Sequence, residues 1–171
     1  MKASIAGLCH FFNTHRMVRE YTERFYMIAD TRCRQLAADD AARARALAAW
    51  MERLRKGWSE VRVEAVDDGP ASSLAVGEQV HARARVHLGP LTPDDVSVEV
   101  YVGRLSADGE ITDATARQML PSGRDENGNY IFEAEAIICC KSGLHGYTVR
   151  VLPYHPDMSV AFVPGLIRWA N

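Results

Sequence analysis

The sequence predicts an α+β protein, in which an N-terminal segment of about three helices precedes an antiparallel β-sandwich of about seven strands. Apolar residues recur at helical spacing through the first third of the chain, and from Ser59 onward they alternate with polar residues. Turn-forming residues separate the alternating runs. We therefore expect two domains, a helical one at 1–58 and a β domain at 59–171.

The most strongly patterned helix is predicted from Phe11 to Tyr26. Arg16 and Glu20 lie at ion-pairing distance on its polar side. Its apolar residues fall within one arc of about a third of the helical wheel, and little chain precedes them to bury them. We expect this arc to contact missing domains of a larger protein, and to be covered in isolation by the third helix or a second copy of the chain. We call it the docking face: Met17, Val18, Tyr21, Phe25 and Ile28.

Two further helices are expected beside this one. A short helix carries Ile5 and Leu8, and an Ala- and Arg-rich helix runs from about Cys33 to Lys56. Gly57 follows a cluster of basic residues, which is typical of a helix C-terminus. The domain boundary is therefore placed at Gly57–Ser59.

The period changes to two after this boundary. Alternating runs predict strands at about 61–65, 80–88 and 96–102, each with one apolar face. Seven short strands of this kind favour a sandwich of immunoglobulin-like size, although the Cys…Trp…Cys core of true immunoglobulins is missing. The remaining strands are expected near 111–120, 130–138, 147–152 and 166–170.

Composition excludes several classes of protein. No apolar run is long enough to cross a membrane, and no secretory signal pattern occurs. Residues 1–58 carry a net charge of +5 and residues 59–171 one of −7, without the concentrated basic face that nucleic acid requires. The four cysteines show neither metal-ligand nor redox spacing, which indicates a reducing cytoplasm.

The helix at 11–26 also carries a resemblance. Its sequence FFNTHRMVREYTERFY, preceded by Met1-Lys2-Ala3-Ser4, resembles the closing segment of bacterial α-glucan (glycogen/maltodextrin) phosphorylases of the short type. In that group an "MK-S…FNT-RMV-EY…FY" pattern follows the catalytic domains. The segments 142–157 and 164–170 look like the additional C-terminal module of the same group. The resemblance spans almost the whole chain but only the tail of such an enzyme.

The resemblance implies a parent enzyme that transfers glucosyl units from an α-1,4-glucan to phosphate, giving glucose 1-phosphate. Pyridoxal phosphate is held there by a lysine in an "EASGT-GMK" motif, between two Rossmann-like domains. That motif is absent here, and Lys2 lacks its context. We therefore expect no catalytic, cofactor-binding or metal-binding residue in this chain, and a role in bracing the catalytic domains. The alternatives are a free-standing glucan-binding module and a dimerisation domain.

Two groups of residues could carry chemistry. His81, Arg83, Arg85 and His87 share one strand face and could bind an anion, but pairing across strands with Glu99, Glu133 or Glu135 is the favoured interpretation. His81 and His87 lie about 20 Å apart along a strand, which excludes a shared metal.

A second group of histidines lies further along the chain. His145, His155 and Asp157 could converge as ligands, but the His-Pro-Asp sequence more often marks a turn.

Other residues were considered for catalysis and for sugar contact. Cys139-Cys140-Lys141 is interpreted as a structural strand end, and Ser142 lacks the context of a nucleophile elbow. Exposed rings stack on sugars, and Tyr101 lies on the polar face of its strand, with Tyr154 in a similar phase. We expect these two tyrosines to be the candidate glucan contacts.

Overall fold

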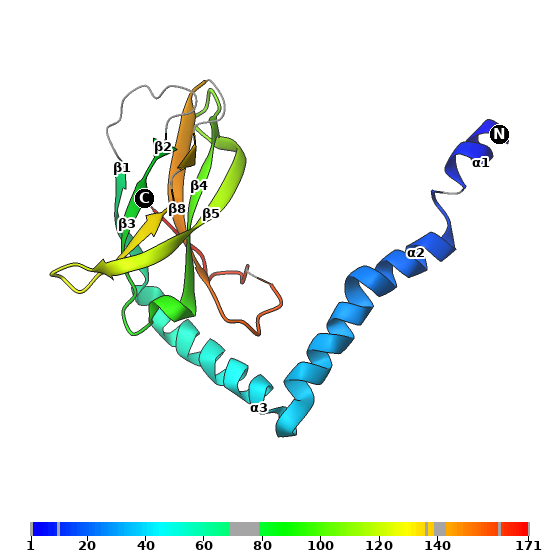
Figure 1. Ribbon diagram of the computed structural model, residues 1–171, viewed down its shortest axis with the longest axis horizontal. Helices are drawn as coiled ribbons and strands as arrows, with labels where there is room; N and C mark the ends of the chain where they lie inside the picture. The colour runs from blue at the N-terminus through cyan, green and yellow to red at the C-terminus, as the bar shows by residue number, and fades with distance from the viewer. Residues whose placement is uncertain are drawn as a thin grey trace. The chain divides into compact units, whose positions relative to one another are not determined.

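The computed structural model describes residues 2–9, 11–68, 79–135, 137–138, 143–160 and 162–170 (Figure 1). They form two compact units, Met1–Ala48 and Ala49–Asn171, and each is described by itself. The second unit contains the whole β-sheet together with the C-terminal end of the long helix.

The predicted second and third helices merge into one helical run. After α1 (Lys2–Leu8), the elements α2 (Thr14–Tyr21), the π-helical turn η1 (Thr22–Tyr26) and α3 (Met27–Gly57) follow without interruption. Asn13 caps the start, because its side chain accepts a hydrogen bond of 2.7 Å from the backbone N–H of Arg16. The predicted gap before Cys33 is therefore wrong, since neither Gly nor Pro lies there to stop a helix.

The backbone breaks instead inside the predicted third helix. Asp39, Asp40 and Ala41 have φ angles of 52–57°, in the left-handed region. Aspartate adopts this conformation more readily than most residues, because its short polar side chain can bond locally.

The docking face is exposed. Each of its five side chains is more than half accessible to solvent. The rings of Tyr21 and Phe25 contact each other, with centroids 5.5 Å apart. Within the first unit the third helix does not cover this face, and its coverage by a second copy of the chain stays a prediction.

The second unit is built on one seven-stranded sheet in which every pair of neighbouring strands is antiparallel, which confirms the predicted strand number and direction. Its strands, in spatial order, are β1 (Arg62–Asp68), β3 (Ala82–His87), β6 (Tyr130–Ala134), β5 (Ile111–Arg124), β4 (Val96–Leu105), β8 (His145–Pro153) and β9 (Arg168–Trp169). The short strands β2 (Gln79–Val80) and β7 (Ile137–Ile138) form a separate pair.

Among the residues that the structure describes, no two sheets pack face to face as in the predicted sandwich, and the immunoglobulin-like architecture is not confirmed. The single sheet curls until its two edges, β1 and β9, come close together. Register shifts interrupt the pairs β1–β3, β4–β5 and β5–β6. Such irregularities bend strands and increase their twist, which brings a single sheet close to a barrel.

The core lies inside the curled sheet. Alternate residues of β3, β4 and β8 point inward, and the C-terminal end of α3 with the 3₁₀ turn η2 (Trp58–Glu60) adds further apolar side chains. The largest fully buried side chains are Phe132, Leu54, Leu88, Met119, Leu152, Val61, Val86, Val98, Val100, Val149 and Val151.

Asp95 joins the end of α3 to this sheet. The residue ends the 3₁₀ turn η3 (Pro93–Asp95) and is 6% exposed. Its Oδ1 accepts hydrogen bonds from Trp50 Nε1 (2.8 Å) and Arg53 Nη2 (2.7 Å). Its Oδ2 accepts from the backbone N–H (3.0 Å) and hydroxyl (2.9 Å) of Thr92. We call Asp95 with these three donor residues the Asp95 hub.

The hub also fixes the ionisation of its carboxylate. Burial raises the pKa of Asp95, but the hydrogen bonds from Thr92, Arg53 and Trp50 outweigh it, so that the pKa lies below its ordinary value. A carboxylate with a lowered folded-state pKa stabilises the fold when the pH is above the pKa that the group has in the unfolded chain. This stabilisation is lost as the pH falls through the folded-state pKa.

Gly57 owes its position to close packing. The helix ends at Gly57, as the sequence predicts, and its φ of −86° is helical. A Cβ at this position would lie 2.7 Å from Cγ of Pro90 and 3.3 Å from Cγ of Leu91. The absence of a side chain therefore lets the helix end approach the turn before η3.

We predict that Gly57→Ala lowers the free energy of unfolding by about 1–2 kcal/mol, because overpacking against the rigid Pro90 ring outweighs the gain in helix propensity. Gly7→Ala is the matched control, since a Cβ at that helical position meets nothing within 4 Å. Urea unfolding of the two variants measures the difference. Equal stability of both would contradict the packing argument.

We predict that Asp95→Asn lowers the free energy of unfolding by about 2 kcal/mol near neutral pH, because hydrogen bonds to an ionised partner are lost. The difference from the wild type should shrink as the pH falls below about 4, the ordinary pKa of an aspartate, and through the lowered folded-state pKa of Asp95, because the variant does not titrate. Thermal unfolding across this range tests both statements. Asp94→Asn, at the exposed neighbouring position, should leave stability nearly unchanged.

Candidate functional site

A row of polar and aromatic side chains crosses the outer face of the sheet. In β4, Glu99 lies between buried valines and therefore points outward. The strand register places it opposite Gln118 of β5 on one side and Arg150 of β8 on the other. Trp169 of β9 lies opposite Arg150. Four neighbouring strands thus present four side chains in one line.

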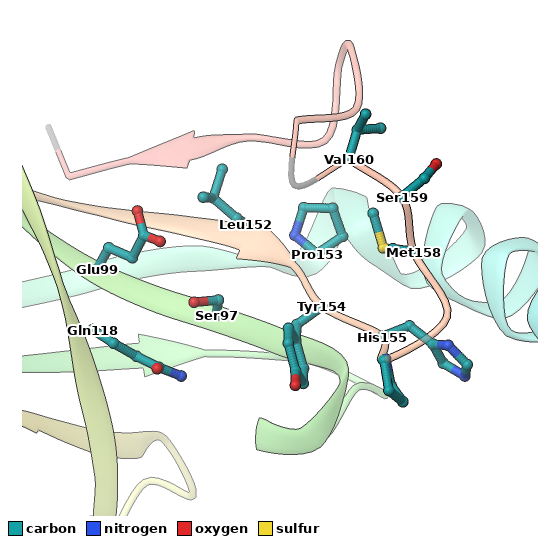
Figure 2. A pocket seen from close by; sticks show the side chains of 11 residues that line it. Ser97, Glu99, Gln118, Leu152, Pro153, Tyr154, His155, Met158, Ser159 and Val160 are labelled. Atoms are coloured by element: carbon teal, nitrogen blue, oxygen red, sulfur yellow. The ribbon is translucent and has the colours of Figure 1, made fainter. Parts of the chain in front are cut away.

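Beside this row lies a cleft of about 350 Å³, between the outer face and the chain that follows β8 (Figure 2). This volume is near the lower end of small-molecule sites. The sheet contributes Ser97, Glu99 and Gln118. The remaining lining residues are Leu152, Pro153, Tyr154, His155, Pro156, Met158, Ser159 and Val160.

Arg150 and Glu99 form a largely buried ion pair at one side of the cleft. Both Nε and Nη2 of Arg150 lie 2.8 Å from Oε2 of Glu99. The two side chains are only 12% and 21% exposed. Their charges cancel, so this part of the cleft is polar without a net charge.

Three aromatic rings surround the Arg150 guanidinium. Its central carbon lies 5.1 Å from the ring centroid of Tyr101, 5.2 Å from that of Phe162 and 5.4 Å from that of Trp169. Tyr101 and Trp169 meet edge to face at 5.5 Å. These cation–π and ring contacts hold the three rings, which we call the aromatic platform.

The wall of the cleft is anchored to the Asp95 hub. The backbone N–H of Tyr154 donates to the carbonyl of Asp95 at 2.9 Å. The ring of His155 packs on Trp50, with centroids 4.9 Å apart. The N–H of Asp157 donates to Nδ1 of His155 at 3.1 Å, which closes a turn. The loop is therefore held by the same residues that hold the helix end.

The two tyrosines predicted to contact glucan lie in one region of the sheet but in different surroundings. Tyr154 lines the cleft and is 50% exposed. Tyr101 belongs to the platform, where it packs against Trp169.

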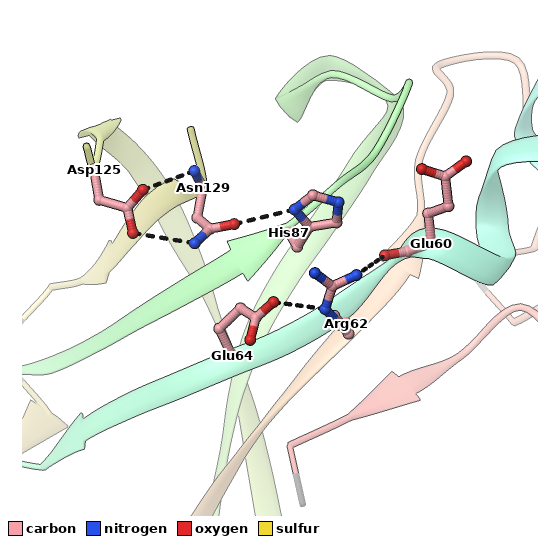
Figure 3. Close-up of polar contacts among 6 residues, drawn as sticks. All are labelled: Glu60, Arg62, Glu64, His87, Asp125 and Asn129. Carbon is pink, nitrogen blue, oxygen red and sulfur yellow. Dashed lines mark hydrogen bonds and ion pairs between the residues drawn. The ribbon is translucent and has the colours of Figure 1, made fainter. Parts of the chain in front are cut away.

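Two residues of the predicted basic stripe have partners outside their own strand, and one of these partners, Glu133, was predicted. Arg83 forms an ion pair with Glu133 at 3.5 Å. His87 Nδ1 lies 3.1 Å from Oδ1 of Asn129, whose amide N–H donates to Asp125 (Figure 3). The predicted partner Glu99 is wrong for this stripe, because Glu99 pairs with Arg150.

The positive charge of Arg85, in the basic stripe, also acts on Asp125 in the turn between β5 and β6. Burial raises the pKa of Asp125, but hydrogen bonds from Asn129 and Asn127 and the positive charge of Arg85 hold it below the ordinary value. The described contacts of Arg83, His87 and Arg85 are therefore with neighbouring protein groups.

His145 and His155 do not converge. They lie at opposite ends of β8, which at about 3.4 Å per residue separates them by well over 20 Å. His145 Nδ1 contacts the carbonyl of Gly143 at 3.0 Å, and His155 belongs to the turn. Within the described ranges, no group of three or more His, Cys, Asp or Glu residues could hold a metal ion.

Of the remaining residues singled out in the sequence, those that the structure describes do not line the cleft. Arg16 pairs with Glu20 at 3.4 Å and covers the ring of Phe11. Residues 139–142, which include the adjacent cysteines and Ser142, lie outside the described residues. Cys9 and Cys33 are free and exposed.

No helix in the described part of the chain is long and apolar enough to cross a membrane.

Sequence reasoning missed most of the cleft. The predicted glucan contacts do not include Trp169, which is 44% exposed, and the sequence pattern singles out neither Arg150 nor Gln118. The available signal was Arg150 itself, a charged residue between the buried Val149 and Val151. Its outward direction was predictable, whereas its partners required the strand register.

Comparison with known proteins identifies the family. The family described as "Glycogen phosphorylase C-terminal domain" matches residues 58–171, and the chain belongs to it. The chain is 32% identical to a maltodextrin phosphorylase of Thermococcus litoralis over 99% of its own length. It is 33% identical to a glycogen phosphorylase of Mycobacterium tuberculosis over 91% of its length.

These relatives are much longer proteins. The chain spans 20% of the Thermococcus litoralis protein and 18% of the Mycobacterium tuberculosis protein. No solved structure matches the chain significantly.

Proposed function

We propose that the chain is the non-catalytic C-terminal part of an α-glucan phosphorylase. The parent enzyme transfers glucosyl units from an α-1,4-glucan to phosphate with the help of pyridoxal phosphate, and acts in the cytoplasm. The observation that carries this proposal is family membership together with relatives named glycogen and maltodextrin phosphorylases. The cofactor-lysine motif of such enzymes does not occur in this sequence, which agrees with a non-catalytic part.

Within the parent, the chain braces the catalytic domains through its docking face. All five of its apolar side chains are more than half exposed, and the relatives carry about four fifths of their length outside the matched segment. Apolar surface of this extent is stabilised by contact with another protein surface. The catalytic domains are the partner that the longer relatives suggest.

We predict that the chain alone releases no glucose 1-phosphate from maltoheptaose and phosphate, even with added pyridoxal phosphate. The sequence supplies no lysine in the cofactor motif, and the phosphate group of the cofactor is needed for proton transfer in the family it resembles. A coupled assay for glucose 1-phosphate measures this. Any turnover proportional to chain concentration would contradict the non-catalytic role.

We predict that Phe25→Glu lowers the temperature of half-inactivation of the full-length parent enzyme by about 1–2 °C, because covering this exposed phenylalanine in the parent contributes about 1.5–3 kcal/mol, spread over a protein about five times as long as the chain. Glu23→Gln, on the polar side of the same helix, is the matched control and should have little effect. Unchanged stability of the Phe25 variant would exclude bracing through this face. Absence of phosphorolysis in the wild-type parent would exclude the parent function itself.

The docking face could instead join two copies of the chain. Sedimentation velocity at micromolar concentration separates the two cases. A monomer that stays monomeric supports docking on the catalytic domains, whereas a dimer that Phe25→Glu dissociates would favour the dimerisation domain.

A further inference from the structure

We propose that the cleft and the aromatic platform together form an auxiliary binding site for an α-1,4-glucan chain, separate from any catalytic site. The identity of the ligand rests on the proposed function, since the relatives are named for glycogen and maltodextrin. The existence and chemistry of the site rest on the geometry of the described residues.

The polar side of the cleft suits a neutral ligand with many hydroxyl groups. Ser97, Glu99 and Gln118 reach it from two neighbouring strands (Figure 2). Arg150 contacts Oε2 of Glu99, so Oε1 can accept a hydrogen bond from a sugar hydroxyl. The amide of Gln118 can both donate and accept. The site therefore offers donors and acceptors without a net charge.

The apolar side suits the C–H faces of sugar rings. Tyr154 forms one wall of the cleft and is 50% exposed. Beyond the Glu99–Arg150 pair, the platform residues Trp169 and Phe162 are 44% and 55% exposed. Rings that are rigidly held and half accessible give contact area at little cost in side-chain entropy. One glucosyl unit would occupy the cleft while the chain continues along the platform.

Other ligands fit this surface less well. A phosphate or carboxylate ligand needs an available cation, but Arg150 is already neutralised by Glu99. A cationic ligand would need the centre of the aromatic platform, which the Arg150 guanidinium occupies. A purely apolar ligand would leave the polar side of the cleft desolvated and unpaired.

The site is preformed. The loop that carries Tyr154 is fixed by its hydrogen bond to the carbonyl of Asp95, and His155 is packed on Trp50. The platform rings are held around Arg150. A preformed site binds a flexible chain without the additional cost of ordering the protein.

The test is a titration of the ¹⁵N-labelled 171-residue chain with maltoheptaose, followed by two-dimensional NMR. We expect saturable shifts of the Trp169 indole N–H and the Gln118 side-chain amide. The buried indoles of Trp50 and Trp58 should stay in place. Cellohexaose, whose linkages are β-1,4, should give shifts at least about tenfold weaker at equal concentration if the platform follows an α-1,4 chain.

Variants assign the binding to these residues. Tyr154→Ala and Gln118→Ala should each weaken maltoheptaose binding by about tenfold, because each removes one side of the cleft. Tyr26→Ala, at an exposed tyrosine outside the cleft, is the matched control and should bind like the wild type. Circular dichroism and thermal unfolding verify that each variant is folded.

Three outcomes would overturn the proposal: no saturable shift at Trp169 or Gln118, unchanged binding by both cleft variants, or equally strong shifts with inorganic phosphate. None of these depends on phosphorolysis by the parent enzyme. Active full-length enzyme with no binding here would refute the auxiliary site and leave the proposed function intact. Binding here without parent activity would refute the proposed function, retain the site and favour a free-standing glucan-binding module.

Discussion

The structure of the second unit depends on the buried carboxylate of Asp95. An ionised carboxylate is costly to bury unless donors surround it, and the four donors from Trp50, Arg53 and Thr92 meet this requirement. Those donors come from the helix end and from the turn before β4, so satisfying one charge joins two elements. The carbonyl of the same residue holds Tyr154. The shape of the cleft therefore follows from the constraint that stabilises the helix.

The elements of the sheet were predictable because alternation is a local signal. The runs around β3, β4 and β8 reveal which residues face the core without knowledge of their neighbours. Closure of the sheet was not predictable, since it depends on register shifts between paired strands. The expected sandwich and the observed curled sheet bury the same alternating positions, so the pattern alone does not distinguish them.

The difference between local signals, which were predictable, and the pairing of distant segments, which was not, also applies to the site and to the helices. Tyr101 and Tyr154 could be selected from strand phase, but Glu99 was assigned to the wrong partner because pairing depends on which strands are neighbours. In the helical segment, periodicity predicted apolar residues that are exposed in the structure. The break at 38–41 has no Gly or Pro to mark it, and only the adjacent aspartates gave a weak signal.

The two exposed surfaces differ in chemistry, which supports the different partners proposed for them. The docking face is continuous apolar surface along a helix, and its free energy is lowered by excluding water against another protein. The cleft combines rings with a neutralised ion pair and an amide, and dry protein contact would leave these polar groups without partners. A hydrated polyhydroxyl chain satisfies them and still covers the rings. This difference in chemistry agrees with the proposal that one surface attaches the chain to a larger enzyme while the other binds glucan.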